Sequence, residues 1–138
     1  GILEITERAK KYGMHVAVVT NLIPGFNDAE TELRGIASWI RDTLGPDTPW
    51  HVTRFHPYYR LHHLLPTPIS ELEGAWAMGK EAGLQYVYIG NVPGHKWENT
   101  YCHKCDKLLI KRFVFEIIEN KIDQGKCPEC GALIPGKF

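Results

Sequence analysis

The sequence has no long apolar run and no excess of charge of either sign. No stretch approaches the roughly 18 consecutive apolar residues that a membrane-spanning helix requires. Lys+Arg and Asp+Glu both number 16 in 138 residues, so no net field attracts nucleic acid or an anionic membrane. We therefore expect a cytoplasmic protein without a membrane partner, and the charge balance makes nucleic acid an unlikely partner.

Familiar catalytic signatures are also missing, and cysteine is scarce. We find no Walker-type phosphate loop, no legible Ser/His/Asp set and no paired-carboxylate arrangement. Cysteine occurs four times, always after residue 100. In a reducing compartment such cysteines are metal ligands more often than disulfides.

A regular alternation of helical and β-rich patterns is present up to residue 95. Hydrophobic spacing predicts three helices, over 2–12, 27–44 and 70–82, and three strands, over 14–23, 50–57 and 85–92. The strands begin about 35 residues apart, a spacing typical of βα units in a parallel sheet. Because crossovers in such sheets are right-handed, we expect an α/β arc that curls in one direction, as in a barrel segment.

Capping patterns accompany two of these helices. Asn27 with Glu30, and Ser70 with Glu73, have the spacing of capping boxes. They predict that the second and third helices begin close to Asn27 and Ser70.

The predicted arc has an unpaired edge. The sequence opens in a helix with no strand before it, and three parallel strands would leave one edge and one face uncovered. We expect further βα units upstream in the full protein. The alternative is a small open sheet that covers its bare face by dimerising.

The composition changes after Pro93-Gly94, so we expect two parts, residues 1–95 and residues 96–138. The second part contains all four cysteines and the short β-rich run "LLIKRFVFEII", which is typical of a hairpin. About 40 residues are few for a core that holds itself together. A bound metal is expected to supply the missing stability.

The most specific motif is a pair of C-x2-C knuckles, Cys102/Cys105 and Cys127/Cys130. Two such knuckles supply four thiolates in a tetrahedron, which saturates a zinc ion and leaves no open position for substrate. The pattern favours structural zinc in a zinc-ribbon-like subdomain. Iron in a rubredoxin-like site and disulfides are the alternatives. His103 lies between ligands, and we expect it to be exposed to solvent.

Polar and aromatic residues follow two predicted strands. Asn21 lies near the end of the first strand, and His56 and Tyr59 lie at the end of the second. Ligands of parallel α/β proteins collect at the carboxyl ends of strands. Taken alone this signal is weak, because the same residues are common in ordinary βα loops.

Several stretches together resemble the radical S-adenosylmethionine enzyme of the AmmeMemoRadiSam system, a family related to pyruvate formate-lyase activating enzymes. The matching stretches are "VVTNLIPGFND", "GPDTPWHVTRFHPYY", "EAGLQYVYIGNVPGH", "NTYCHKC" and "CPECG". The resemblance covers essentially the whole chain and implies the later units of a partial (βα)6 barrel followed by the zinc-ribbon-like tail. It also implies S-adenosylmethionine and a [4Fe-4S] cluster as cofactors, which together generate a 5′-deoxyadenosyl radical.

The chain departs from the family at the cluster site. The C-x3-C-x2-C motif of the family is absent, and so is its glycine-rich motif after the second barrel strand. The resemblance therefore implies a carboxyl-terminal part that is inactive alone, with the cluster ligands in preceding barrel units of the same protein. The substrate is unknown, and a protein of the same system is one candidate.

By resemblance, five residues approach the adenosyl part of the cofactor: Asn21, Ile23, Pro24, His56 and Tyr59. Two other functions remain open. The tail is a binding module for protein or nucleic acid, using Lys104, Lys107, Lys111 and Arg112, or it serves structurally by capping the barrel or docking a partner.

Overall fold

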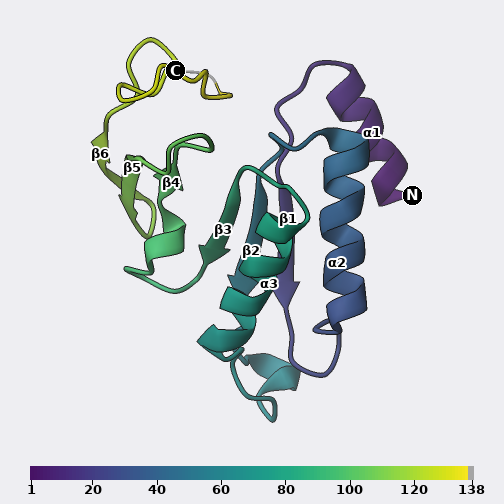
Figure 1. Cartoon of the computed structure of the whole chain (residues 1–138). Helices are drawn as coiled ribbons and strands as arrows, with labels where there is room; N and C mark the ends of the chain where they lie inside the picture. Colours follow the sequence, from purple (N-terminus) through teal and green to yellow (C-terminus); the bar gives the residue numbers. More distant parts are fainter. Residues whose placement is uncertain (137–138) are drawn as a thin grey trace.

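The computed structural model of the chain describes residues 1–136, which form a parallel α/β unit followed by an antiparallel ribbon (Figure 1). The α/β unit contains α1 (Ile2–Lys11), β1 (Val18–Leu22), α2 (Glu30–Trp39), β2 (Trp50–Arg54), α3 (Ile69–Glu81) and β3 (Val87–Gly90). The ribbon contains β4 (Thr100–Tyr101), β5 (Leu108–Phe113) and β6 (Glu116–Asn120). A π-helical turn (Ile40–Leu44) extends α2, and short 3-10 turns cover Tyr59–Leu61 and Lys96–Glu98.

The first sheet has the strand order β1-β2-β3, and both pairings are parallel. Val18 pairs with Trp50, and Trp50 pairs with Val87. Since side chains alternate along a strand, this register places Trp50, Val52, Val87 and Ile89 on one face. That face packs against α2 and α3, and its core comprises Leu22, Leu33, Ala37, Ile40, Trp50, Val52, Leu72, Ala75, Leu84, Val87 and Ile89. The predicted parallel helix–strand units are therefore present.

The helices approach the sheet closely at Gly79 of α3. A Cβ atom at this position would lie 2.9 Å from the Trp50 ring and 2.9 Å from a methyl group of Val87. Trp50 itself is fully buried and donates its indole N–H to Thr20 Oγ1 at 3.0 Å. Glycine costs about 1 kcal/mol of helix propensity here, and the close contact between α3 and β2 explains why it is present.

Both predicted capping boxes are wrong. Asn27 Oδ1 accepts the backbone N–H of Ile23, and Asp28 Oδ2 accepts that of Gly25, both at 2.8 Å. These side chains stabilise the Pro-Gly turn after β1, and α2 begins only at Glu30. Ser70 lies inside the first turn of α3, whose N-cap is Pro68. At the first of these places, the turn before α2 uses the side chains that the pattern assigned to the helix.

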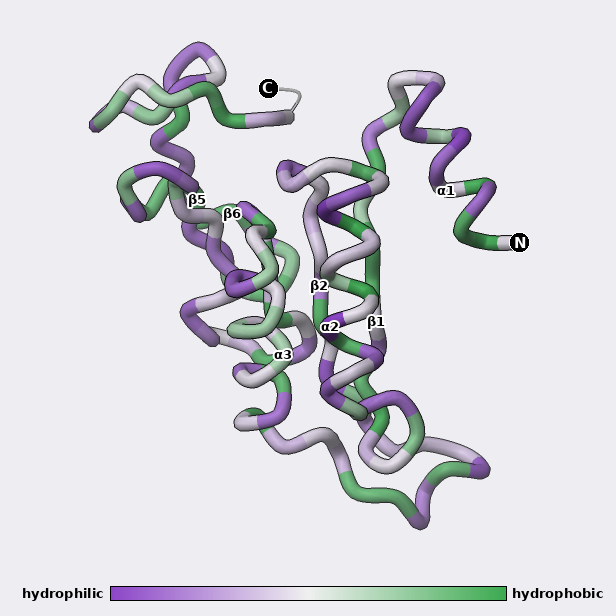
Figure 2. Tube along the Cα trace, turned by 45° about the vertical axis from the view of Figure 1, so that its right-hand side comes forward, coloured by the Kyte–Doolittle hydropathy of each residue, from purple (hydrophilic) through white to green (hydrophobic). Residues whose placement is uncertain are grey.

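The predicted strands are longer than the observed ones, which cover Val18–Leu22, Trp50–Arg54 and Val87–Gly90. Among residues 1–136, β1 has a strand neighbour on one side only. Apolar side chains of β1 and α1 are exposed, including Val19 at 63% and Ile2 at 78%. Figure 2 shows α1 standing apart from the helices that cover the sheet, with hydrophobic segments near its amino end.

A buried threonine joins the ends of β1 and β2. Thr67 Oγ1 donates to Leu22 O at 2.6 Å and accepts the N–H of Phe55 at 2.9 Å. Replacing it by valine keeps the shape and leaves both buried backbone groups without this partner, which costs about 1–3 kcal/mol for each group. Thr67→Val is therefore expected to lower the free energy of unfolding in urea by about 3 kcal/mol.

The exposed bond from Thr6 Oγ1 to Ile2 O in α1 provides the control. Thr6→Val is expected to change the same free energy by about 0.5 kcal/mol or less. Equal effects of the two substitutions would contradict the role assigned to Thr67.

The ribbon lies beside β3 (Figure 1) and is held there mainly by aromatic contacts. The ring of Trp97 stacks on that of Trp76 in α3, with centroids 3.8 Å apart and planes 13° apart. His95 Nε2 lies 3.1 Å from a Glu73 carboxylate oxygen. His103 is half-buried, and its Nδ1 lies 2.9 Å from Tyr86 Oη. The prediction that His103 is exposed is wrong, because the ribbon folds against β3 at this point.

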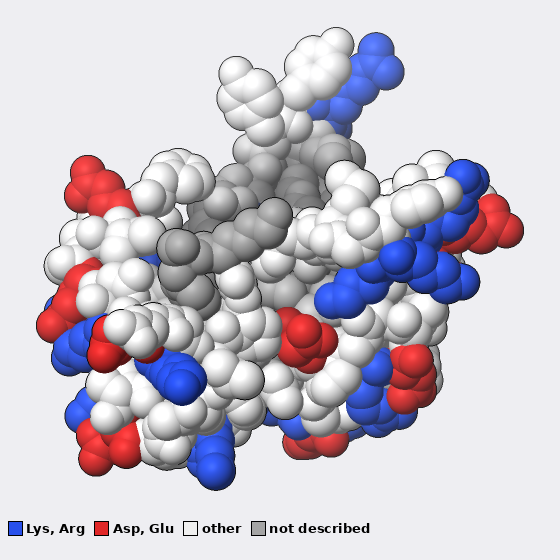
Figure 3. Space-filling view, turned by 90° about the horizontal axis from the view of Figure 1, so that it is seen from above, with Lys and Arg blue, Asp and Glu red and all other residues white. Residues whose placement is uncertain are grey.

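Charges of both signs are mixed over the surface (Figure 3). Lys107 on the ribbon pairs with Glu129 at 3.4 Å, and Lys121 pairs with Glu119 at 3.2 Å. Within the described residues, no helix is both long enough and apolar enough to span a membrane.

Candidate metal centre and adjoining cleft

The four cysteines lie in two tight turns of the ribbon. In the first turn, Asp106 N donates to Cys102 O at 3.0 Å, and Asp106 has a φ of 57°. In the second, Gly131 N donates to Cys127 O at 2.9 Å, and Gly131 has a φ of 70°. The left-handed residue closes each turn so that both sulfurs of a pair point to the same side. Glycine adopts this conformation without strain.

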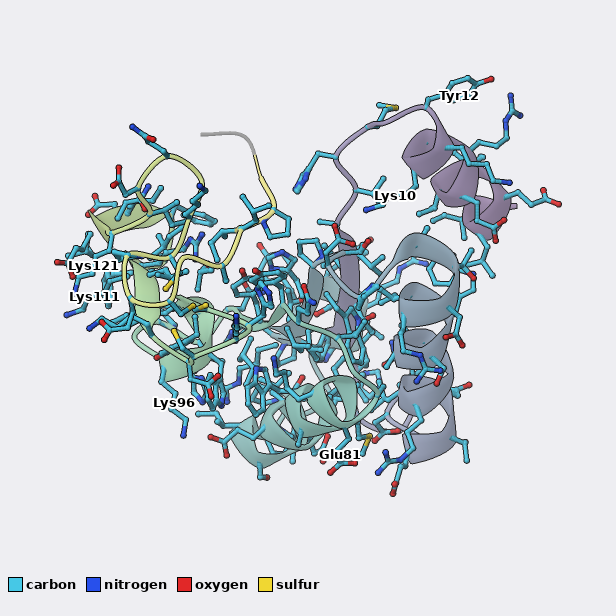
Figure 4. The ribbon with its side chains drawn as sticks, turned by 45° about the horizontal axis from the view of Figure 1, so that its top comes forward. Lys10, Tyr12, Glu81, Lys96, Lys111 and Lys121 are labelled. Carbon is cyan, nitrogen blue, oxygen red and sulfur yellow. The ribbon has the colours of Figure 1, made fainter. Side chains whose placement is uncertain are left out.

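The sulfur positions fit a single tetrahedral ion. All four Sγ atoms lie within 4.8 Å of one another. The Cys102–Cys130 and Cys105–Cys127 separations are 3.6 and 3.7 Å, and these pairs share no atom. Four thiolates about 2.3 Å from a central ion would be about 3.8 Å apart. The two separations therefore match opposite edges of a tetrahedron, and the four cysteines are positioned to hold a metal ion (sulfur is yellow in Figure 4).

The turns also favour thiolate at one position. Burial alone would raise the pKa of Cys127, but the backbone N–H groups of Cys130 and Glu129 lower it to about 7. The backbone N–H of Lys107 likewise lowers the pKa of Cys105. There, desolvation and the neighbouring sulfurs prevail and raise the pKa to about 12. A cation at the centre would remove this competition, because it favours the charged form of every thiol.

The metal centre is part of the small core of the ribbon. Cys102 and Cys127 are 0% and 2% exposed, and they pack with Leu109, Ile110 and Ile134. So few buried apolar side chains provide little hydrophobic stabilisation. The fold of the ribbon is expected to depend on the ion.

A cleft of about 990 Å³ separates the ribbon from the face of the sheet that α2 and α3 do not cover. Its polar lining includes His51 and Thr53 of β2, Tyr88 of β3 and Arg112 of β5. Its apolar lining comes largely from the ribbon and includes Val114, Phe115, Ile117, Ile122 and Ile134. The volume lies within the range of small-molecule sites.

The polar groups of the cleft form a connected row. The rings of His51 and Tyr88 stack with centroids 4.8 Å apart. Tyr88 Oη lies 3.0 Å from Thr100 Oγ1, which accepts from Arg112 Nη1 at 2.6 Å. Burial raises the pKa of Tyr88, although its bond to Thr100 and the charge of Arg112 act in the opposite sense. Tyr88 therefore stays neutral and serves as a hydrogen-bonding group.

Burial, and then the charge of Arg112, lower the pKa of His51 below its usual value of 6.5. The unfolded chain therefore binds a proton at higher pH than the folded chain does. Stability that is fully present above about pH 6.5 is expected to fall as the pH decreases toward the folded-state pKa. His51→Phe should remove this part of the pH dependence, measured as the free energy of unfolding at pH 7.5 and 6.0.

The exposed His63 is the control for this experiment. His63→Gln should retain the wild-type difference between the two pH values. Any effect of pH on metal binding is common to all three proteins and cancels in the comparison. Identical pH dependence in wild type and His51→Phe would contradict the prediction.

The five residues assigned to the cofactor by resemblance lie outside the residues that line this cleft. Asn21 is exposed at the end of β1, where Asn27 Nδ2 donates to its carbonyl oxygen at 3.0 Å, and Ile23 and Pro24 form the adjacent turn. His56 lies near β3, with Nε2 3.4 Å from Asn91 O. Tyr59 is 74% exposed in a 3-10 turn and lies under the Arg60 guanidinium.

The residues of β2 and β3 that line the cleft were not predicted from the sequence. His51 and Thr53 alternate with the buried Trp50 and Val52, and Tyr88 alternates with Ile89. This period of two marks a second, polar face of the strands. The signal is present in the sequence.

Fold and site together define a parallel α/β arc with a ribbon across its polar face, and the four cysteines of the ribbon are positioned to hold a metal ion. Comparison with known proteins finds a relative in Methanocaldococcus jannaschii, which is named uncharacterized protein MJ0808. The two are 47% identical over 135 residues, which make up 96% of this chain and 40% of the relative. The chain thus spans less than half the length of that relative. No family model and no solved structure matches the chain.

Proposed function

We propose that this chain is the carboxyl-terminal part of a radical S-adenosylmethionine enzyme and that its ribbon is held by structural zinc. The observation that carries the proposal is the sheet, whose parallel strands are covered by helices on one face and carry polar side chains on the other. In a barrel the uncovered face lines the interior, where ligands bind at the carboxyl ends of the strands. This chain covers 40% of the relative from Methanocaldococcus jannaschii, and the remaining barrel units would correspond to the rest of that relative's length.

The four-cysteine centre does not fit the iron–sulfur cluster of such an enzyme. Its sulfurs lie within 4.8 Å of one another and surround space for one ion, whereas a cubane of four irons would hold its cysteine sulfurs farther apart. The four thiolates also leave no open coordination position. We assign zinc a structural role, and the cluster ligands would come from residues outside these 138.

When bound with its cluster, S-adenosylmethionine supplies a 5′-deoxyadenosyl radical. The residues of this chain would position it. The turn from Asn21 to Pro24 is held by Asn27 and Asp28 and presents a fixed backbone at the end of β1. His56 and Tyr59 would flank the cofactor at the next strand end.

The test uses the complete gene product that contains this chain, reconstituted anaerobically with iron and sulfide. With dithionite and S-adenosylmethionine it should form 5′-deoxyadenosine, and Asn21→Ala should reduce the rate while Lys111→Gln leaves it unchanged. The 138-residue chain alone should form none. A cluster-loaded gene product that forms no 5′-deoxyadenosine would overturn the proposal.

A binding role for the ribbon is the second candidate, and one observation favours a protein partner. The β5–β6 hairpin exposes apolar side chains, with Phe115 96% exposed and Ile117 61% exposed. The basic residues nearby are in part paired with acids. Anisotropy measurements with random oligonucleotides at low salt should therefore show no binding. Binding that weakens with added salt would instead support nucleic acid.

A further inference from the structure

Arg112 is a half-buried cation in the cleft without an acidic partner. Its Nη1 donates to Thr100 Oγ1 at 2.6 Å and to Glu98 O at 3.4 Å, and its guanidinium carbon lies 5.8 Å from the centre of the Tyr88 ring. Among residues 1–136 it forms no ion pair, and its Nε and Nη2 make no hydrogen bond. A guanidinium has five donors in a fixed fork, so most of its capacity remains for a ligand.

The acids that line the cleft are engaged elsewhere. The carboxylate of Glu98 accepts the backbone N–H groups of Gly94 at 3.0 Å and Val114 at 3.3 Å. Asp47 lies 3.9 Å from Lys10 Nζ. The charge of Arg112 is therefore compensated only by neutral oxygens, in a position where burial strengthens its field.

His51 responds to this field, since the charge of Arg112 adds to burial in lowering its pKa. The charged groups of the cleft lining are Lys10, Asp47, Glu98 and Arg112, and its other titratable groups are His15, His51, Tyr86 and Tyr88. The positive charges of Lys10 and Arg112 equal in number the negative charges of Asp47 and Glu98. The lining thus suits one negative charge next to Arg112 and does not suit a polyphosphate.

We propose that the cleft binds a carboxylate through Arg112, with the apolar part of the ligand against the ribbon. Guanidinium and carboxylate match in a bidentate pair, and Tyr88 Oη is linked to the guanidinium through Thr100 Oγ1. The apolar wall formed by Val114, Phe115 and Ile117 lies in the same cleft. The carboxylate belongs either to a free organic acid or to the carboxyl terminus of a peptide. The inference does not depend on the proposed radical chemistry.

The experiment is an NMR titration of the zinc-loaded 138-residue chain with 3-phenylpropanoate and with its uncharged analogue 3-phenylpropanamide. The acid should bind about tenfold more tightly than the amide, because only the acid forms charge-assisted bonds. It should shift the Arg112 Nε–H and His51 ring signals and raise the pKa of His51. A second arm compares Ala-Phe-Leu peptides with free and amidated carboxyl termini, to distinguish a peptide from a free acid.

Arg112→Gln should abolish the preference for the acid. Lys111→Gln, at the exposed neighbouring position on the outer side of the ribbon (Figure 4), should retain it. If Arg112→Gln does not fold, the acid and amide titrations of the wild-type chain decide the question. Equal binding of acid and amide, or no shift of Arg112 and His51 with either acid, would overturn the proposal. Formation of 5′-deoxyadenosine by the complete gene product tests the proposed function and has no bearing on carboxylate binding by the cleft.

Discussion

Replacement of Cys127 by serine is expected to unfold the ribbon and to abolish stoichiometric metal binding. A serine hydroxyl stays protonated and is a poor zinc ligand, so the ion loses one of its four anchors. Metal binding contributes apparent free energies of about 10–16 kcal/mol in small zinc domains, far more than the few buried side chains around Cys127 can supply. NMR spectra should lose the dispersed signals of residues 96–136, and metal analysis should show the loss of zinc.

The α/β unit should keep most of its own signals in this variant, since its core forms separately between α2, α3 and β1–β3. His103→Gln is the matched control. It lies between two ligands, but its contact is with Tyr86, so the variant should keep its metal. A Cys127→Ser protein with stoichiometric zinc and native ribbon signals would contradict the assignment.

Replacement of Trp97 by alanine is expected to detach the ribbon from the α/β unit. Trp97 stacks on Trp76 and meets the ring of Tyr101 edge to face at 5.5 Å. Trp76 Nε1 in turn donates to Val87 O at 3.0 Å, which fixes the stack on β3. Truncating a packed tryptophan costs about 3 kcal/mol or more. We expect this loss in urea unfolding, with a larger radius of gyration by small-angle X-ray scattering as the cleft opens.

Tyr101→Phe provides the comparison, because it keeps the ring contact and removes only the exposed bond to Lys96 O. Its radius of gyration should equal that of the wild type. If Trp97→Ala gives the same scattering curve as Tyr101→Phe, the stack does not hold the ribbon in place.

The metal centre could be predicted from the sequence because its geometry is local. Each C-x2-C pair closes its own turn, as Asp106 and Gly131 show, and only the meeting of the two turns needs the tertiary fold. The parallel strands could be predicted for a similar reason. Trp50 and Val52 in β2, and Val87 and Ile89 in β3, alternate with less buried residues and give each strand one apolar face, the pattern of a half-buried strand.

The start of α2 at Glu30 could not be predicted in this way. Asn27 had the right spacing from Glu30 for a helix cap, but the Pro-Gly turn places the N–H groups of Ile23 and Gly25 close to the side chains of Asn27 and Asp28. Side chains of this kind bond to the nearest free backbone donor, and spacing alone does not identify that donor.

The cleft forms only in the tertiary structure. Its proposed ligand-binding residue, Arg112, lies in the second part of the chain, residues 96–138, which is predicted from the sequence as a part separate from the α/β unit. In the sequence, Arg112 is one of four basic residues assigned to a binding role of the tail, with no link to the sheet. The Trp76–Trp97 stack turns the ribbon across the sheet and brings Arg112 over Tyr88. Hydrophobic periodicity gives no information on this docking, because a few aromatic side chains in the connection determine it.

X-ray absorption at the metal edge of the purified 138-residue chain tests most directly whether a closed four-thiolate centre holds the ribbon. The account predicts about one zinc per chain, surrounded by four sulfurs at about 2.3 Å and by no nitrogen or oxygen ligand. An iron edge, fewer than four sulfur neighbours, or a metal-free chain with a native ribbon would contradict it.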